Sequence, residues 1–306
     1  NTTASNNTAV GYQAAYTNTT GTAITALGYQ AGYTNTANYL TAVGYQALRL
    51  NTTGTENVSM GLQTLYSNTT GVGNTGVGYQ THYLNSTGTY NSALGQGALY
   101  TNTTASQNVA IGAFSLYKNT ASNNTAVGYK AGYSNTTGDV CAFGREVMYS
   151  NTTGAYNSAF GRYQTLYSNT TGNYNSAFGE QALYSNTTAS NNTAVGYQAM
   201  YSNQTGTSNV AVGHTALYSN TATMALQAME LVAGGSPALL SSSSTAVTTY
   251  YNTATTSTFS WTIAQRDANG NLFSNTFIGV ATSARYADLA ERYESDCSYG
   301  EGTVLI

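Results

Sequence analysis

A short repeat, with a period of about 17 residues, fills most of the chain and limits what it can fold into. The stretch NTTASNNTAVGYQAMYS at 186–202 is nearly a copy of NTTASNNTAVGYQAAYT at 1–17. From position 1 to position 219 there are 13 units of nearly constant length, with the consensus N-T-T-G-x-x-N-T-A-V-G-Y-Q-A-L-Y-S. Such a unit is too short for a helical hairpin, and its length suits one coil of a β-solenoid.

Each unit contains a short alternating run, such as NTAVG at 7–11, and this run predicts a strand. The residue before the glycine is apolar in all 13 units. We expect this residue, and the one two positions earlier, to face into the solenoid, and the alanine between them to face outward. The apolar residues are Val10, Leu27, Val43, Met60, Val77, Leu94, Ile111, Val127, Phe143, Phe160, Phe178, Val195 and Val212.

The glycine that follows each run is present in every unit, from Gly11 to Gly213. An invariant glycine predicts a corner that needs a positive φ or a close approach to the next coil. The N-T-T-G segment predicts the return turn, and stacking would align its asparagines into ladders. A second apolar position should cover another wall of the core, and its leucines include Leu48, Leu65, Leu99 and Leu183.

A tyrosine stands two residues before the next unit in 12 of the 13 units, and Arg49 takes its place in the remaining one. Two interpretations are open: a stacked structural ladder, or an aromatic surface that stacks on sugars or another surface. These tyrosines are Tyr16, Tyr33, Tyr66, Tyr83, Tyr100, Tyr117, Tyr133, Tyr149, Tyr167, Tyr184, Tyr201 and Tyr218.

The sequon N-x-S/T opens 11 of the 13 units, which makes its asparagines candidates for N-glycosylation. Turn chemistry explains the same residues without glycans. Because stacked coils are about 4.8 Å apart, we expect partial rather than full occupancy. The candidates are Asn1, Asn18, Asn51, Asn68, Asn85, Asn102, Asn135, Asn151, Asn169, Asn186 and Asn203.

Composition argues against several function classes. Only 6% of residues are charged and the net charge is −3, so a basic footprint for nucleic acid is absent. The sequence has no apolar run of membrane-span length and no phosphate-loop, zinc-protease or serine-hydrolase motif. His82 and His214 replace a leucine and a tyrosine of the repeat. We therefore expect no enzyme, no cofactor, no metal, no nucleic-acid partner and no membrane insertion.

After Asn220 the repeat decays, and we divide the chain into a repeat domain at 1–219, a Ser/Thr-rich connection at 220–255 and a C-terminal region at 256–306. RDANGN lies between the apolar stretches FSWTIAQ and LFSNTFIGV and predicts a hairpin. ARYADLAERYE has helical spacing. The chain begins inside a repeat, and we interpret it as a piece of a longer polypeptide.

Two resemblances extend this interpretation. NVAIG and NVAVG resemble the head repeat of trimeric autotransporter adhesins, which are left-handed parallel β-rolls of three chains with a shorter unit. The block ARYADLAERYESDCSYGEGTVLI resembles the distal region of phage and virus tail fibres, with Glu301 in place of their usual proline. These resemblances imply a homotrimer on a virion surface or otherwise extracellular, and a glycan or protein receptor on a cell.

The sequence therefore predicts an all-β fold: a parallel β-solenoid or β-roll of 13 coils, each about 17 residues long, trimeric, with a small C-terminal hairpin and helix. A single thin roll buries few residues per unit, which also favours three rolls with a shared core. The expected function is a structural adhesion fibre. The alternatives are a self-assembling extracellular filament and an ice-binding solenoid, which we rank lower because its threonines are expected in the turn or on the inward face.

Overall fold

The computed structural model describes residues 3–220, 228–229, 265–266 and 272–273. Contacts divide the chain into two units, Asn1–Pro237 and Ala238–Ile306, and each is described by itself. The regular secondary structure of the described residues is entirely β-strand. The helix expected within 284–294 lies outside the described residues.

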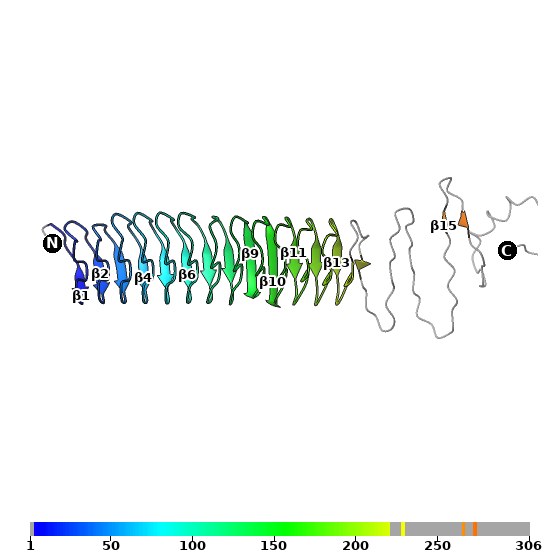
Figure 1. Ribbon diagram of the computed structural model, residues 1–306, viewed down its shortest axis with the longest axis horizontal. Helices are drawn as coiled ribbons and strands as arrows, with labels where there is room; N and C mark the ends of the chain where they lie inside the picture. Colours follow the sequence, from blue (N-terminus) through cyan, green and yellow to red (C-terminus); the bar gives the residue numbers. More distant parts are fainter. Residues whose placement is uncertain (1–2, 221–227, 230–264, 267–271, 274–306) are drawn as a thin grey trace, which may run out of the picture. The chain divides into compact units, whose positions relative to one another are not determined.

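One sheet of 14 strands runs through the first unit, and each coil of the repeat contributes one strand (Figure 1). All the strand pairs are parallel and follow chain order, which confirms the predicted parallel β-solenoid. The strands are β1 Thr8–Val10, β2 Ile24–Leu27, β3 Leu40–Val43, β4 Val58–Met60, β5 Thr75–Val77, β6 Ser92–Leu94, β7 Val109–Ile111, β8 Thr125–Val127, β9 Val140–Arg145, β10 Asn157–Tyr163, β11 Ser176–Phe178, β12 Thr193–Val195, β13 Val210–Val212 and β14 Ala228–Met229.

The strands pair in the register of the repeat. Ala9 lies opposite Ala26, Ala26 opposite Ala42, and the same alignment continues through the coils. Some coils are one residue longer or shorter than the rest and still keep this register, so differences in length are absorbed in the turns or, at β10, in a bulge. Each coil therefore presents its successor with the backbone groups that a parallel strand needs.

The prediction of which strand face points inward was wrong. In β2 and β3 the alanines, Ala26 and Ala42, are fully buried, whereas Leu27 beside Ala26 is 45% exposed. The same holds from β2 to β13: the residue two positions before the corner glycine is buried, and the apolar residue directly before that glycine faces outward. We call the outward column, from Val10 to Val212, the apolar ridge.

The reason for this inversion is the small space inside the coil. At Gly76, which holds the inward position of β5, an added Cβ would lie 2.7 Å from Cγ2 of Thr64 and 3.6 Å from Leu65. Even a methyl group is too close to its neighbours at this coil, and the other coils place only alanine or serine at this position, so a valine or phenylalanine does not fit. Hydrophobicity alone favours valine over alanine for the core, but the available volume decides.

The predicted leucine wall is confirmed, because Leu48, Leu65, Leu99 and Leu183 are fully buried opposite the strand alanines. Their backbone conformation was not expected. Leu65 has a φ of 50°, and Gln63 and Glu56 of the same coil have φ values of 54° and 60°. These three positions are left-handed in nearly every described coil and are mostly occupied by residues other than glycine, although an L-residue there costs roughly 1–2 kcal/mol.

The corner glycines behave as predicted. Gly128 has a φ of 136°, and a Cβ on it would overlap the carbonyl group of Gly144 in the next coil. Gly44 has a φ of 134° and the same relation to Gly61. Both reasons for glycine, the positive φ and the close backbone approach, therefore apply at one position.

Two columns of buried asparagine run along the inside of the coils. The first opens each unit, and its Nδ2 donates to Oδ1 of the preceding coil, as from Asn68 to Asn51 at 2.7 Å. The second was not singled out from the sequence. In this second column, each Oδ1 accepts a hydrogen bond from the backbone N–H of the equivalent asparagine one coil later. The N–H of Asn91, for example, donates to Oδ1 of Asn74 at 3.0 Å. Buried backbone groups at the turns are thus satisfied by side-chain amides, which is what a dry interior requires.

In the second unit, β15 Gln265–Arg266 pairs antiparallel with β16 Leu272–Phe273. The two strands are separated by only five residues of the RDANGN segment, and their antiparallel pairing confirms the predicted hairpin. The rest of the C-terminal block lies outside the described residues.

Candidate interaction surface

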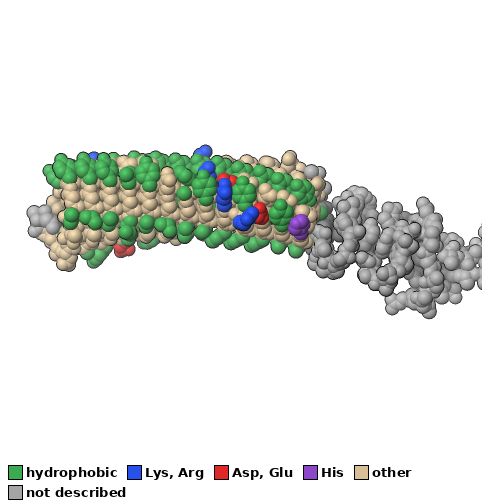
Figure 2. Space-filling model, turned by 90° about the horizontal axis from the view of Figure 1, so that it is seen from below, with side chains coloured by type: hydrophobic (Ala, Val, Ile, Leu, Met, Phe, Trp, Pro, Cys, Tyr) green, Lys and Arg blue, Asp and Glu red, His purple; other side chains and the backbone are tan. Residues whose placement is uncertain are grey.

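The apolar ridge is the most unusual surface of the repeat region. It is apolar in all 13 units, although Val10 is 55% exposed, Leu94 49% and Ile111 40%. Figure 2 shows hydrophobic side chains, tyrosines included, gathered in rows that run from coil to coil along the stack. The repeat replaces many outward residues freely yet never places a polar one in this column, and a contiguous exposed apolar row of this kind is a candidate interaction surface.

The column beside the ridge on the same strand face carries small side chains. Thr8, Thr25 and Thr75 are exposed there, and Cys141 and Val58 are half-buried. Burial raises the pKa of the Cys141 thiol, so it stays protonated near neutral pH. Threonine was expected on the inward face, and this expectation was wrong for the same reason as the ridge. The outer sheet face therefore combines a bulky apolar row with a flat row of small side chains.

The expected tyrosine column forms a stacked ladder. Neighbouring rings lie nearly parallel, with centroids 5.2 Å apart for Tyr117 and Tyr133 and 5.4 Å for Tyr16 and Tyr33. Arg49 fills the gap in the column, and its guanidinium lies 5.5 Å from the centroid of the Tyr33 ring and 5.7 Å from that of Tyr66. A planar guanidinium thus replaces one ring of the stack.

This stacking bears on the two interpretations of the tyrosine column. A sugar stacks on the face of an aromatic ring, but the ring faces here are covered by the neighbouring rings above and below. Only ring edges and phenol hydroxyls point to solvent. The geometry therefore favours the structural ladder over a sugar-stacking platform.

Two further columns were not singled out from the sequence. Tyr12, Tyr29 and Tyr45 stack just after the corner glycines, with centroids 5.3 and 5.0 Å apart. His214 continues this position in the last coil and stacks 5.1 Å from Tyr197, as its tyrosine-like place suggested. Only some units carry an aromatic residue at this position, so the tyrosine in the repeat consensus was the only sequence feature that could have predicted this column.

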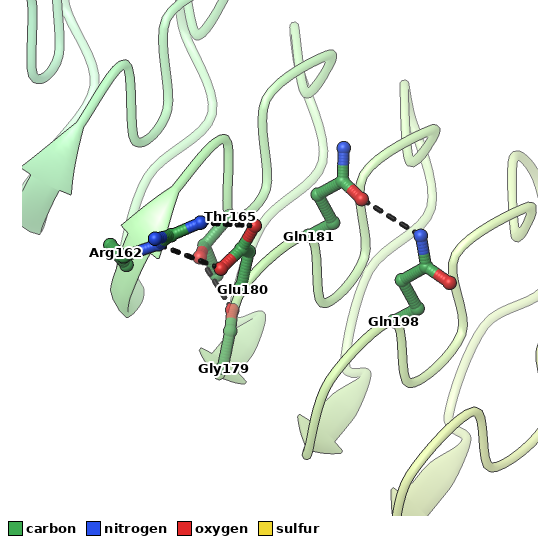
Figure 3. A network of polar contacts seen from close by, with 6 residues as sticks. All are labelled: Arg162, Thr165, Gly179, Glu180, Gln181 and Gln198. Atoms are coloured by element: carbon green, nitrogen blue, oxygen red, sulfur yellow. Dashed lines mark hydrogen bonds and ion pairs between the residues drawn. The ribbon is translucent and has the colours of Figure 1, made fainter.

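The next position forms a glutamine ladder. Nε2 of each glutamine donates to Oε1 of the preceding one, at 2.9 Å from Gln30 to Gln13 and at 2.8 Å from Gln198 to Gln181 (Figure 3). Such ladders add a side-chain hydrogen bond between coils at a half-buried surface.

Charged residues interrupt these ladders in the C-terminal half of the stack. Arg162 makes a two-point contact with Glu180, with Nε and Nη2 at 2.9 and 3.2 Å from its carboxylate oxygens (Figure 3). Arg145 lies over the rings of Tyr129 and Tyr163, at 5.9 and 5.2 Å from their centroids. These exposed contacts add little stability, but they give this part of the surface a charge pattern of its own.

The candidate glycosylation column lies inside the coils. All of its members except Asn1, which is outside the described residues, are at most 5% exposed. Their side-chain nitrogens, which would carry the glycan, donate to internal carbonyls, as from Asn151 to Gly154 at 2.9 Å. A glycan on this nitrogen does not fit the folded coil, so turn chemistry and the ladder account for the column. The buried members are Asn18, Asn51, Asn68, Asn85, Asn102, Asn135, Asn151, Asn169, Asn186 and Asn203.

His82 takes a position in the leucine wall and is completely buried. Neither of its ring nitrogens has a hydrogen-bond partner among the described residues. Desolvation lowers the pKa of this imidazole from 6.5 to about 3. The side chain is therefore neutral in the folded coil, and nothing beside it could use it for proton transfer.

The described residues include no group of three or more His, Cys, Asp or Glu side chains placed to hold a metal ion. Over the same part of the chain, no helix is long and apolar enough to cross a membrane. Comparisons with protein-family models, curated proteins and solved structures find no match to this chain.

Proposed function

We propose that the repeat region is the rod of a structural adhesion fibre, in which copies of the chain lie side by side and cover each other's apolar ridge. The observation that carries this proposal is the ridge itself: it is apolar in all 13 units, yet in the single chain eight of its residues are exposed and the other five are half-buried. A virion or another extracellular surface is the proposed location, and a cell-surface glycan or protein is the proposed receptor.

The free energy gained by covering the ridge is large enough to favour association of two or more chains. Covering one half-exposed ridge side chain contributes roughly 1 kcal/mol, and the ridge repeats this in 13 coils. Association costs roughly 4–15 kcal/mol in lost freedom, so most of the ridge must be covered at once. A parallel arrangement with the coils level does this, because both surfaces then repeat with the same spacing.

A homotrimer is the proposed number of chains. Each chain has one ridge, and three ridges that meet on an axis close the assembly without leaving an apolar face exposed. The resemblance to trimeric adhesin heads supports three rather than two. A two-chain assembly with ridges facing each other is the outcome that would correct the number but keep the interface.

Light scattering on the purified chain tests this proposal. We expect a native mass near three times 32.0 kDa. The double substitution Leu94→Lys and Ile111→Lys should lower the mass to that of one chain and keep the circular dichroism of the folded coil. Thr104→Lys, at an exposed turn position, is the matched control and should leave the mass unchanged. A wild-type monomer would contradict the proposal.

One observation supports each of the two alternative functions, the extracellular filament and the ice-binding solenoid. An end-to-end filament would continue the same parallel pairing from one chain to the next, so the uniform register between coils supports it. The outward threonines beside the ridge support ice binding, although valine, serine and cysteine interrupt their row. Filaments of indefinite length in electron micrographs would favour the first alternative, and thermal hysteresis would favour the second.

A further inference from the structure

The tyrosine column contains an uninterrupted run of ten rings, from Tyr66 to Tyr218. All nine contacts within it have centroid separations of 4.9–5.4 Å and interplanar angles of 4–15°. No other described side-chain column repeats one oxidisable group so regularly. The rings are half-buried along most of the run, so their edges are open to solvent.

Four phenols of this run are held in their neutral form. Desolvation raises the pKa of Tyr83, Tyr100, Tyr167 and Tyr201, and repulsion from neighbouring phenolates, or from Glu146 in the case of Tyr167, adds to it. At neutral pH these four rings therefore keep their hydroxyl protons. A neutral phenol loses this proton together with an electron when a one-electron oxidant acts on it.

We propose that the tyrosine column is an oxidative cross-linking site, at which successive coils become joined by dityrosine bonds. A one-electron oxidant removes one electron from each of two neighbouring phenols, and each phenol releases its hydroxyl proton. The unpaired electrons of the two phenoxyl radicals reside partly on the ring carbons ortho to oxygen. Two such carbons form a new carbon–carbon bond, and their two hydrogens return to the oxygens.

The atoms and electrons balance with a haem peroxidase and hydrogen peroxide as the oxidant. The two tyrosines lose two electrons and two protons in total, and one molecule of hydrogen peroxide takes these up and becomes two molecules of water. The stack favours the coupling step because it holds equivalent ortho carbons of adjacent rings over each other. It also brings radicals together, because an electron can pass between stacked rings until two radicals are neighbours.

The consequence is a covalent bond between coils that otherwise interact through hydrogen bonds and side-chain packing. The column contains its own negative control, because Arg49 separates Tyr33 from Tyr66 by two coils. These two rings cannot reach each other in the folded chain. Coupling is therefore expected within Tyr16–Tyr33 and within the ten-ring run, and not between the two segments.

The test treats the dilute purified chain with a haem peroxidase and hydrogen peroxide. We expect dityrosine fluorescence, together with cross-linked peptides that have lost two hydrogen atoms. Mapping by mass spectrometry should find neighbours such as Tyr117–Tyr133 and no Tyr33–Tyr66 link, within chains that keep the mass of one copy on a denaturing gel. The substitution Arg49→Tyr should add links to Tyr33 and to Tyr66, whereas Arg49→Phe, which has the ring without the hydroxyl, should add none.

Two results would overturn the proposal. One is an equal dityrosine yield and an equal set of links in the chain unfolded by urea, because coupling would then not depend on the stack. The other is coupling only between chains, seen as a higher mass on the denaturing gel. Neither result bears on the fibre proposal, because the tyrosine column and the apolar ridge are separate surfaces.

Discussion

Two hydrophobic clusters lie inside the same stack of coils and differ in extent. The first extends from Ile24 to Leu65 and the second from Ala93 to Ala216. Between them the coil of β5 places Gly76, Thr81 and His82 where most coils have two alanines and a leucine. The apolar core is therefore interrupted once, at a single coil.

The hydrogen bonds between coils show no such interruption. The backbone N–H of Leu65 donates to Thr81 at 2.9 Å, and that of His82 donates to Ala98 at 2.9 Å. In the first asparagine column, Asn85 donates to Asn68 at 2.8 Å. The comparison indicates that backbone hydrogen bonds hold the stack continuous, while apolar packing adds stability in two separate stretches. The first asparagine column crosses this coil but is broken further on, because Asn119 Nδ2 donates to the carbonyl of Ala121 and leaves Oδ1 of Asn102 without a partner among the described residues.

The largest expected effect comes from the corner glycines. Gly128→Val, beside the second cluster, and Gly44→Val, beside the first, each force a side chain into the carbonyl of the next coil at a positive φ. If the ladders carry the continuity, both variants should lose about 3 kcal/mol or more of unfolding free energy. Denaturant unfolding measures the loss, and limited proteolysis should place the new cleavage sites at the altered coil.

Thr104→Val, at an exposed turn, is the control for these variants and should stay within about 0.5 kcal/mol of the wild type. Unchanged proteolytic resistance of Gly128→Val would show that the corner assignment is wrong. A much larger loss in Gly128→Val than in Gly44→Val would show that packing in the second cluster carries the continuity.

The second-largest expected effect is a loss of stability in mild acid, caused by His82 in the coil of β5. His82 has a folded pKa of about 3 against 6.5 for the free side chain, so the folded state excludes its charged form. The unfolding free energy that depends on a neutral His82 is fully present well above pH 6.5, and it decreases as the pH falls from 6.5 toward 3. The loss is about 1.4 kcal/mol per pH unit, or about 2 kcal/mol between pH 6.5 and pH 5.

Unfolding free energies measured across this pH range for the wild type and for His82→Leu check the effect. The leucine variant joins the two clusters and should have a flatter pH dependence. Thr104→Val, at an exposed turn without a titratable side chain, is the control and should keep the wild-type slope. Equal slopes for the wild type and His82→Leu would rule out His82 as the cause.

The smallest expected effect concerns the left-handed positions, in the coil just before the interruption. Glu56 is exposed and has a φ of 60°, and Gly73 holds the same position one coil later. Glu56→Gly removes a strain of roughly 1–2 kcal/mol but adds chain entropy worth roughly 0.5–1 kcal/mol, for a net gain of about 0.5 kcal/mol. Thermal unfolding checks the sign. Thr53→Gly, at a position without a positive φ, should lower stability instead.

The periodicity of the sequence was sufficient for the fold class. The repeat length predicted the solenoid, the invariant glycine predicted the corner, and the leucines predicted one wall of the core. The strand face was not predictable in the same way, because alternation separates two faces without saying which one is inward. The small volume beside the leucine wall admits only alanine, serine or glycine on the inside, and no pattern in a single unit reveals that volume.

The left-handed positions also escaped prediction, for a related reason. Glycine or asparagine normally signals a positive φ, but here Gln63 and Leu65 adopt it. Their conformation is imposed by the neighbouring coils, whose backbone bonds determine where each residue must lie. The apolar ridge was visible in the sequence as a column, and its outward direction, which makes it a candidate interface, came only from the structure.

Because the register stays constant between coils of unequal length, the length of this solenoid is set by the number of its units. Each unit enters and leaves the stack at equivalent points, one strand spacing apart, so a unit can be duplicated or deleted without disturbing the others. The near-identical stretches at 1–17 and 186–202 are what such copying leaves behind. A gene that gains or loses one unit changes the length of the solenoid by about 4.8 Å, so selection can adjust that length in whole steps.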